Sequence, residues 1–186
     1  MQITDAGLRS LGNSSHILSS INISHAKLIS DIGLASLSSG CTKLKVLECS
    51  GLFQLADPRL SAPKLSAQAA AWQTILGVAA LAKYCPNIEH LDFSGCFRLN
   101  VSIQRYVSCL TKLKTLLLSG CPLDPESVIA VAKNCPSLTD VNFSDCGKGV
   151  NGAGMKALAS NCKGLRVVIL GELFDYSHND SSNLQP

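Results

Sequence analysis

Apolar residues recur along this chain in a short phrase of fixed spacing. Counted from its first apolar residue, each copy is apolar at positions 1, 4 and 6, as in IEHLDFSGC (88–96) and LTDVNFSDC (138–146). The copies begin at Leu18, Leu44, Ile88, Leu113, Leu138 and Leu165, with steps of 26, 44, 25, 25 and 27 residues. Positions 4 and 6 are separated by one residue, which gives this segment a period of two. This period predicts a short β-strand with one buried face.

Helix-like runs follow several of these strand phrases, at 29–40, 123–134 and 150–161. Ser30, Asp124 and Asn151 are suitable N-cap residues, and Pro125 suits the first position of a helix. Each unit is therefore predicted to be one strand plus one helix. Such units bury a shared core only when they stack on one another, as repeats of a solenoid do.

Cysteines mark fixed positions in these repeats. Cys41, Cys85, Cys135 and Cys162 stand three residues before a strand leucine or isoleucine, and Cys96, Cys121 and Cys146 follow the strand. With the ITDAGL and ISDIGL helix starts, the pattern resembles the cysteine-containing leucine-rich repeats of F-box proteins. The resemblance implies an α/β leucine-rich-repeat solenoid of about six repeats, with a curved parallel β-sheet inside and helices outside. We expect it to cover residues 1–173, followed by a polar tail at 174–186.

The same resemblance carries an expectation about function. It implies a non-catalytic protein–protein interaction module, similar to the substrate-recognition region of an F-box-type ubiquitin ligase adaptor. The alternative is a structural scaffold subunit of a larger protein assembly, because the repeats at either end have no polar cap. Either role makes the chain part of a larger chain or complex.

The nine cysteines also bear on redox state and metal binding. Their number is odd, and no C-x-x-C pair occurs in the chain. We interpret them as reduced thiols in the core, and we expect neither a disulfide framework nor a metal site. Reduced thiols indicate a cytoplasmic or nuclear protein. No sequence motif calls for a cofactor.

Composition narrows the classes of partner. The chain has 46% hydrophobic and 16% charged residues, and its net charge is only +3. No apolar run approaches the roughly 18 residues that a membrane span needs, so we expect no such span. The small positive charge alone does not indicate nucleic-acid binding.

Strand alternation places two columns of side chains on the concave face of the expected sheet. These columns contain carboxylates but neither lysine nor arginine, which disfavours a nucleic-acid partner and favours a protein partner with a basic segment. The first column is Ser20, Val46, His90, Thr115, Asp140 and Val167, and the second is Asn22, Glu48, Asp92, Leu117, Asn142 and Ile169. The candidate binding residues are Glu48, His90, Asp92, Thr115, Leu117, Asp140 and Asn142.

An enzymatic reading of His90, Asp92 and Ser94 is not favoured. Successive residues on one strand face lie about 6.6 Å apart, too far for the hydrogen bonds of a catalytic relay. Serine also recurs at the position of Ser94 in other repeats, which indicates a turn. We therefore predict no catalytic residues.

The insertion and the basic residues at the strand starts each have two interpretations. The long step between repeats contains an insertion at 53–72, where Trp72 is either helix packing or an alternative contact for a partner. Basic residues flank the strand starts, which predicts a ribbon along one rim that keeps the surface soluble or binds anions. These are Lys43, Lys45, Lys112, Lys114, Lys163 and Arg166.

Overall fold

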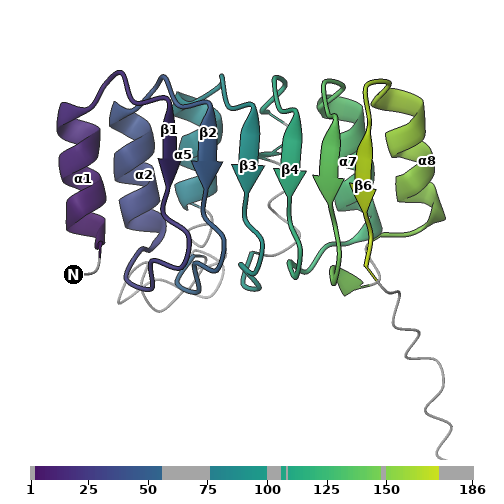
Figure 1. Cartoon of the computed structure of the whole chain (residues 1–186), viewed down its shortest axis with the longest axis horizontal. Coiled ribbons are helices and arrows are strands. Elements are labelled where there is room, and N and C mark those ends of the chain that lie inside the picture. Colours follow the sequence, from purple (N-terminus) through teal and green to yellow (C-terminus); the bar gives the residue numbers. More distant parts are fainter. Residues whose placement is uncertain (1–2, 56–75, 100–105, 108, 148–149, 172–186) are drawn as a thin grey trace, which may run out of the picture.

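The computed structural model describes residues 3–55, 76–99, 106–107, 109–147 and 150–171. Its strands form one parallel sheet in which each strand pairs with the next along the chain (Figure 1). The strands are β1 (Ser20–Asn22), β2 (Val46–Glu48), β3 (His90–Asp92), β4 (Thr115–Leu117), β5 (Asp140–Asn142) and β6 (Val167–Ile169). The helices are α1 (Asp5–Ser14), α2 (Asp31–Gly40), α5 (Leu76–Tyr84), α7 (Pro125–Asn134) and α8 (Gly152–Asn161).

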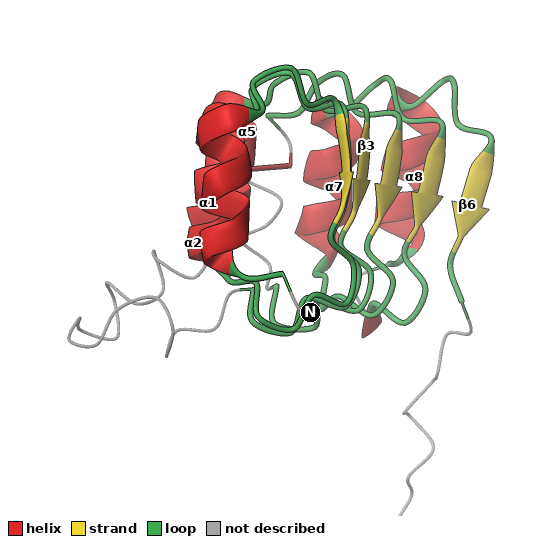
Figure 2. Ribbon diagram, turned by 60° about the vertical axis from the view of Figure 1, so that its left-hand side comes forward, coloured by secondary structure: helices red, strands yellow, loops and turns green. Residues whose placement is uncertain are grey.

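The sheet and the helices form two layers of a solenoid. Figure 2 shows the strands on one side of the molecule and the helices on the other. Parallel strands cannot be joined by tight hairpins. Helices α2, α5, α7 and α8 each lie in the connection between two successive strands. The predicted α/β leucine-rich-repeat solenoid, with a parallel sheet inside and helices outside, is confirmed.

The core lies between the layers and is filled by the middle residue of each strand. Leu47, Leu91 and Leu116 are fully buried, and Val141 is 1% exposed. At the last strand the equivalent Val168 is 37% exposed, because no further repeat packs against it among the described residues. Burial of one such leucine side chain contributes about 1.5–3 kcal/mol, so the repeated middle residue contributes to stability in each inner repeat.

The helices begin at the predicted caps. The side chain of Ser30 accepts a hydrogen bond from the backbone N–H of Ile32, and Asn151 accepts from the N–H groups of Ala153 and Gly154. Asp124 caps α7 in the same way, with Pro125 at the start of the helix. These bonds satisfy backbone donors that have no partner inside the helix.

Aspartates at helix starts also tie neighbouring repeats together. Asp5 accepts hydrogen bonds from the backbone N–H and the hydroxyl of Ser30, at 2.8 and 2.6 Å. Asp31 accepts from the N–H of Gly77 at 3.0 Å. The stacking of repeats is therefore fixed by polar contacts at the helix starts as well as by the apolar core.

Parts of the sequence predictions fall outside the described residues. Residues 53–55 pack with the repeats, with Leu55 fully buried. The remainder of the expected insertion, including Trp72, and the tail at 174–186 are not among the described residues. Within the described part, no helix has the length and apolar character needed to cross a bilayer.

Candidate functional site

The register of the sheet produces the two concave columns. Ser20, Val46, His90, Thr115, Asp140 and Val167 stand side by side across all strands. The second column, two residues further along each strand, is aligned in the same way and consists of Asn22, Glu48, Asp92, Leu117, Asn142 and Ile169. The structure therefore brings all seven candidate binding residues on the strands together on one surface.

The first column is open to solvent and makes few structural contacts. His90, Thr115 and Asp140 are each half-buried by their neighbours across the sheet. The carboxylate of Asp140 accepts a hydrogen bond from the hydroxyl of the adjacent Thr139 at 2.6 Å. This bond is local, so the first column holds side chains that the fold does not require.

The second column is partly used by the fold. Asp92 Oδ1 accepts a hydrogen bond from the backbone N–H of Ser94 at 2.8 Å, and Asn142 Oδ1 accepts from that of Ser144 at 3.0 Å. Asn22 does the same for Ser24 at 2.9 Å. A short carboxylate or amide can reach the N–H two residues ahead and close a turn. Asp92 and Asn142 therefore stabilise the turns after their strands as well as lining this surface.

Glu48 and Leu117 occupy the same column without closing a turn. The longer side chain of Glu48 accepts a hydrogen bond from the side-chain amide of Asn22. Leu117 is a half-buried apolar side chain between Asp92 and Asn142. Glu48 and Leu117 are therefore second-column positions that can contact a partner without opening a turn.

The charge of this surface is negative. Glu48, Asp92 and Asp140 are the carboxylates of the two columns, and neither column contains lysine or arginine. The arrangement attracts cationic side chains.

The cysteines form two rows of thiols beneath the loops. Cys96, Cys121 and Cys146 are buried and donate to backbone carbonyls of the preceding repeat, at 3.2, 3.1 and 3.1 Å. Cys85 and Cys135 make similar contacts near the strand starts. Eight of the nine cysteines are buried, as predicted for core thiols, whereas Cys109 is exposed. The thiols also act as weak hydrogen-bond donors, which their apolar setting did not predict.

Burial alters the acidity of these thiols. Desolvation raises the pKa of Cys85 to about 11, and the pKa of Cys146 also rises to about 11 for the same reason. A thiol that stays protonated is a poor nucleophile and a poor metal ligand. In the described ranges no group of three histidine, cysteine or acidic side chains is arranged to hold a metal ion.

Sequence reasoning missed an exposed aromatic pair. Phe53 and Phe97 follow β2 and β3 at equivalent positions, with ring centroids 5.6 Å apart, and they are 43% and 53% exposed. The equivalent residues after β1, β4 and β5 are Lys27, Pro122 and Gly147, and the sequence has Phe174, outside the described residues, at this position after β6. The repeat does not require an aromatic residue at this position. An alignment of the repeats could therefore have identified Phe53 and Phe97 as unusual residues.

Comparison with known proteins agrees with this geometry. Residues 109–132 and 134–159 match the family model described as leucine rich repeat. The chain is similar to the tropomodulin C-terminal domain of Caenorhabditis elegans, with 14% identity over 91% of this chain and 84% of that chain, at a TM-score of 0.49. It is also similar to a chain in the crystal structure of the yeast Rad7 and Elc1 complex, with 16% identity and a TM-score of 0.52.

The second match covers 89% of this chain but 47% of that chain, so this chain spans about half the length of that neighbour. An identity of 16% supports a shared fold and nothing finer. Together with the parallel sheet and its regular register, the matches establish the architecture. Leucine-rich repeats match at residues 109–132 and 134–159, and the described chain folds as an α/β leucine-rich-repeat solenoid.

Proposed function

We propose that the chain is a non-catalytic module that binds a protein partner on the concave face of β2–β5. The observation that carries the proposal is the aligned set of solvent-facing side chains on these strands, which combine carboxylates with Leu117. Solenoid concavities commonly serve as extended binding surfaces. The partner segment carries basic side chains opposite Glu48, Asp92 and Asp140, and an apolar side chain opposite Leu117.

The finer role that we propose is substrate recognition for a ubiquitin ligase, as in F-box adaptors with leucine-rich repeats. The cysteine pattern supports this role, since thiols recur before and after the strands as in that class of repeat. The fold neighbour in the Rad7 and Elc1 complex is a protein that assembles with another protein. The proposed compartment is the cytoplasm or the nucleus.

The proposal that a partner binds the concave face can be tested by removing negative charge from that face. Asp92→Asn with Asp140→Asn removes two negative charges and keeps an oxygen acceptor for the bonds from Ser94 and Thr139. Partners captured from cell extract by the unchanged chain are expected to be retained less well by this variant, and the difference shrinks in high salt.

The matched control is Glu126→Gln with Asp145→Asn, which removes two exposed charges away from the concave strands. This control is expected to retain partners as the unchanged chain does. Equal retention by both double variants would contradict a concave site. The identity of the captured proteins tests the finer role: cullin-type ligase subunits support the adaptor, and their consistent absence counts against it.

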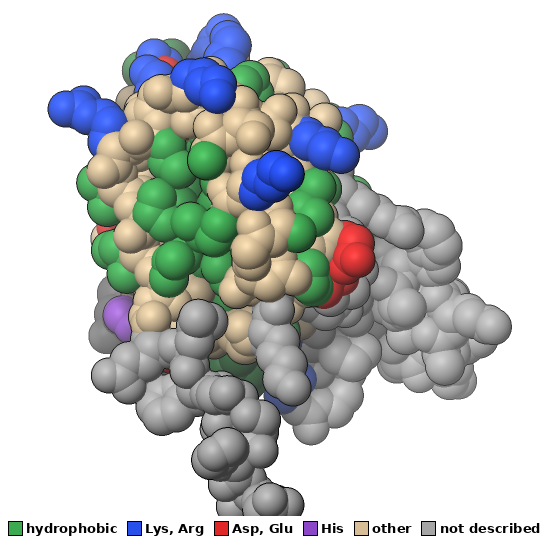
Figure 3. Space-filling view, turned by 90° about the vertical axis from the view of Figure 1, so that its right-hand side faces the viewer, with side chains coloured by type: hydrophobic (Ala, Val, Ile, Leu, Met, Phe, Trp, Pro, Cys, Tyr) green, Lys and Arg blue, Asp and Glu red, His purple; other side chains and the backbone are tan. Residues whose placement is uncertain are grey.

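A scaffold subunit is the second candidate, and the last strand favours it. Val167, Val168 and Ile169 of β6 are 44%, 37% and 47% exposed. Figure 3 shows apolar side chains gathered on this end of the molecule below a row of lysine and arginine. If the unchanged chain captures one stoichiometric assembly from cell extract and Val168→Asp does not, the scaffold role is supported. If Val168→Asp captures the same assembly, the result counts against that role.

A further inference from the structure

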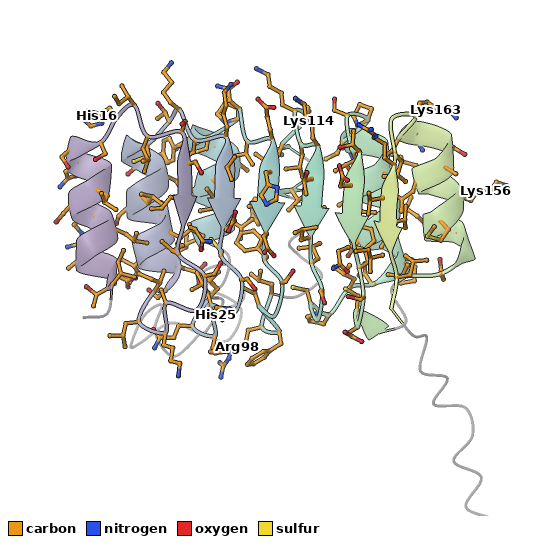
Figure 4. The ribbon with its side chains drawn as sticks, in the orientation of Figure 1. His16, His25, Arg98, Lys114, Lys156 and Lys163 are labelled. Atoms are coloured by element: carbon orange, nitrogen blue, oxygen red, sulfur yellow. The ribbon has the colours of Figure 1, made fainter. Side chains whose placement is uncertain are left out.

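Basic side chains gather along the edge of the sheet where the strands begin, here named the amino edge. It comprises the helix ends and loops at 13–19, 39–45, 83–89, 109–114, 133–139 and 160–166. Figure 4 shows Lys114 and Lys163 at this edge, and His25 and Arg98 at the opposite one. All of its lysines and arginines are exposed: Lys43, Lys45, Lys83, Lys112, Lys114, Lys133, Lys163 and Arg166.

Helix ends account for only part of this positive charge. Lys83 and Lys133 lie in the last turns of α5 and α7, and Lys163 Nζ donates to the carbonyl of Ala159 at 3.2 Å. Cations at these places offset the negative end of a helix dipole. Lys43, Lys112 and Arg166 instead lie in loops next to a strand, so another reason is needed for them.

A single carboxylate offsets the charge among the described residues of the amino edge. Glu89 lies between Lys45 and Lys114, with nitrogen–oxygen distances of 3.5 and 2.7 Å. The hydrogen bond from Lys114 and its charge hold the pKa of Glu89 below its usual range. Lys112 bonds to the neutral side chain of Asn87 at 2.6 Å. In the part of the chain that the structure describes, no carboxylate lies within ion-pair distance of Lys43, Lys112 or Arg166.

We propose that the amino edge is a second binding surface, which takes an acidic protein segment in extended conformation. The basic side chains run across the whole sheet, from β2 to β6. Neighbouring strands lie about 4.8 Å apart, so this row is about 20 Å long, and six or seven extended residues span it. A run of aspartate and glutamate of that length matches the row in charge and in reach.

Features of the edge favour an acidic peptide over nucleic acid. Arginine is the residue of choice for phosphate recognition, whereas this edge is almost entirely lysine. Its exposed aromatic residue, Tyr84, already has Lys83 Nζ 4.8 Å from the centre of its ring. The carboxylates of the concave columns begin directly beside the edge and repel a wide polyanion such as a duplex.

The probe for this proposal is a fluorescein-labelled peptide of seven glutamates, titrated with the chain and followed by fluorescence anisotropy. Lys43→Gln with Lys112→Gln removes two charges without breaking a described ion pair, and is expected to weaken binding about three- to tenfold. Glu89→Gln removes the opposing charge and is expected to tighten binding about two- to threefold. Both effects shrink as salt is raised.

Lys27→Gln with Lys156→Gln is the matched control, because both residues are exposed and lie away from the amino edge. It is expected to bind the peptide as the unchanged chain does. An equal loss in this control, or absence of binding at low salt, would overturn the proposal. So would tighter binding of a single-stranded oligonucleotide or of anionic vesicles than of the peptide. The concave variant Asp92→Asn with Asp140→Asn is expected to keep peptide binding, which separates this surface from the proposed function.

Discussion

The two edges of the sheet use their exposed side chains differently. At the carboxyl edge, where strands end, Asp92 and Asn142 close turns and Gly51 adopts a positive φ of 66°. At the amino edge, exposed lysines reach into solvent and their contacts are few. Buried thiols lie beneath both edges.

This contrast separates positions that the fold needs from positions left open for binding. Side chains at the carboxyl edge satisfy backbone groups, so changes there act first on stability. Side chains of the first concave column and the basic side chains of the amino edge satisfy few backbone groups, so changes to them act first on binding. Other residues of that edge, such as Asn134 and Asn161, do donate to backbone carbonyls. The following predictions test this division, from the largest expected effect to the smallest.

The largest effect concerns the thiols that both edges share. Burial raises the pKa of Cys85 and Cys146 to about 11 from an ordinary value of 9.0. Their contribution to stability is therefore full below about pH 8.5 and is lost as pH rises towards 11. We expect the free energy of unfolding to fall by about 1 kcal/mol for each such thiol by pH 10. Urea titrations at pH 7.5 and pH 10 measure this loss.

The variant Cys146→Ala tests whether ionisation of a buried thiol causes the loss of stability at alkaline pH. This variant starts less stable at pH 7.5, and its loss between pH 7.5 and pH 10 is expected to be smaller. A loss of the same size would show that other groups cause the alkaline effect.

The next effect compares a glycine at each edge. Gly51 has a φ of 66°, and a Cβ there would lie 2.5 Å from Nδ1 of His25. Even if His25 moves away, the left-handed backbone strains alanine, so Gly51→Ala is expected to cost about 1–2 kcal/mol. At the amino edge, a Cβ on Gly164 meets Thr139 Cγ2 at 3.6 Å, an ordinary contact. Gly164→Ala is expected to change stability by less than about 0.5 kcal/mol; equal effects would refute the division.

The third prediction concerns the turn after β3. Asp92→Ala leaves the N–H of Ser94 without its acceptor and is expected to cost about 1 kcal/mol in the free energy of unfolding. Asp92→Asn keeps the acceptor, as Asn22 and Asn142 do in their own repeats, and is expected to be nearly neutral. If both variants lose the same stability, the charge of Asp92 stabilises the fold rather than its turn bond.

The smallest effect is expected in the first concave column. Thr115→Ala and Asp140→Asn remove no hydrogen bond to the backbone of another repeat, so each is expected to change stability by less than about 0.5 kcal/mol. Thermal unfolding of both variants beside Asp92→Ala gives the comparison. A loss above 1 kcal/mol at either position would place this column among the residues that the fold requires.

The sequence predicted the strands, the helix caps and the columns because each depends on a local period. Alternation decides which side of a strand Leu91 and Asp92 occupy, and the repeat decides that neighbouring copies align. The turn bond of Asp92 escaped prediction because it depends on backbone conformation after the strand. The exposed pair Phe53–Phe97 and the thiol contacts with carbonyl oxygens depend on how neighbouring repeats stack, which a period in the sequence does not specify.

The location of a bound partner tests the central claim most directly. A photo-crosslinking amino acid is placed at Thr115, in the middle of the first concave column. Two comparison positions are Glu126 on the helical layer and Phe53 at the start of the insertion. We expect a partner captured from cell extract to crosslink at Thr115 and not at Glu126 or Phe53. A partner that crosslinks at Glu126 or Phe53 and not at Thr115 would contradict the concave-face account.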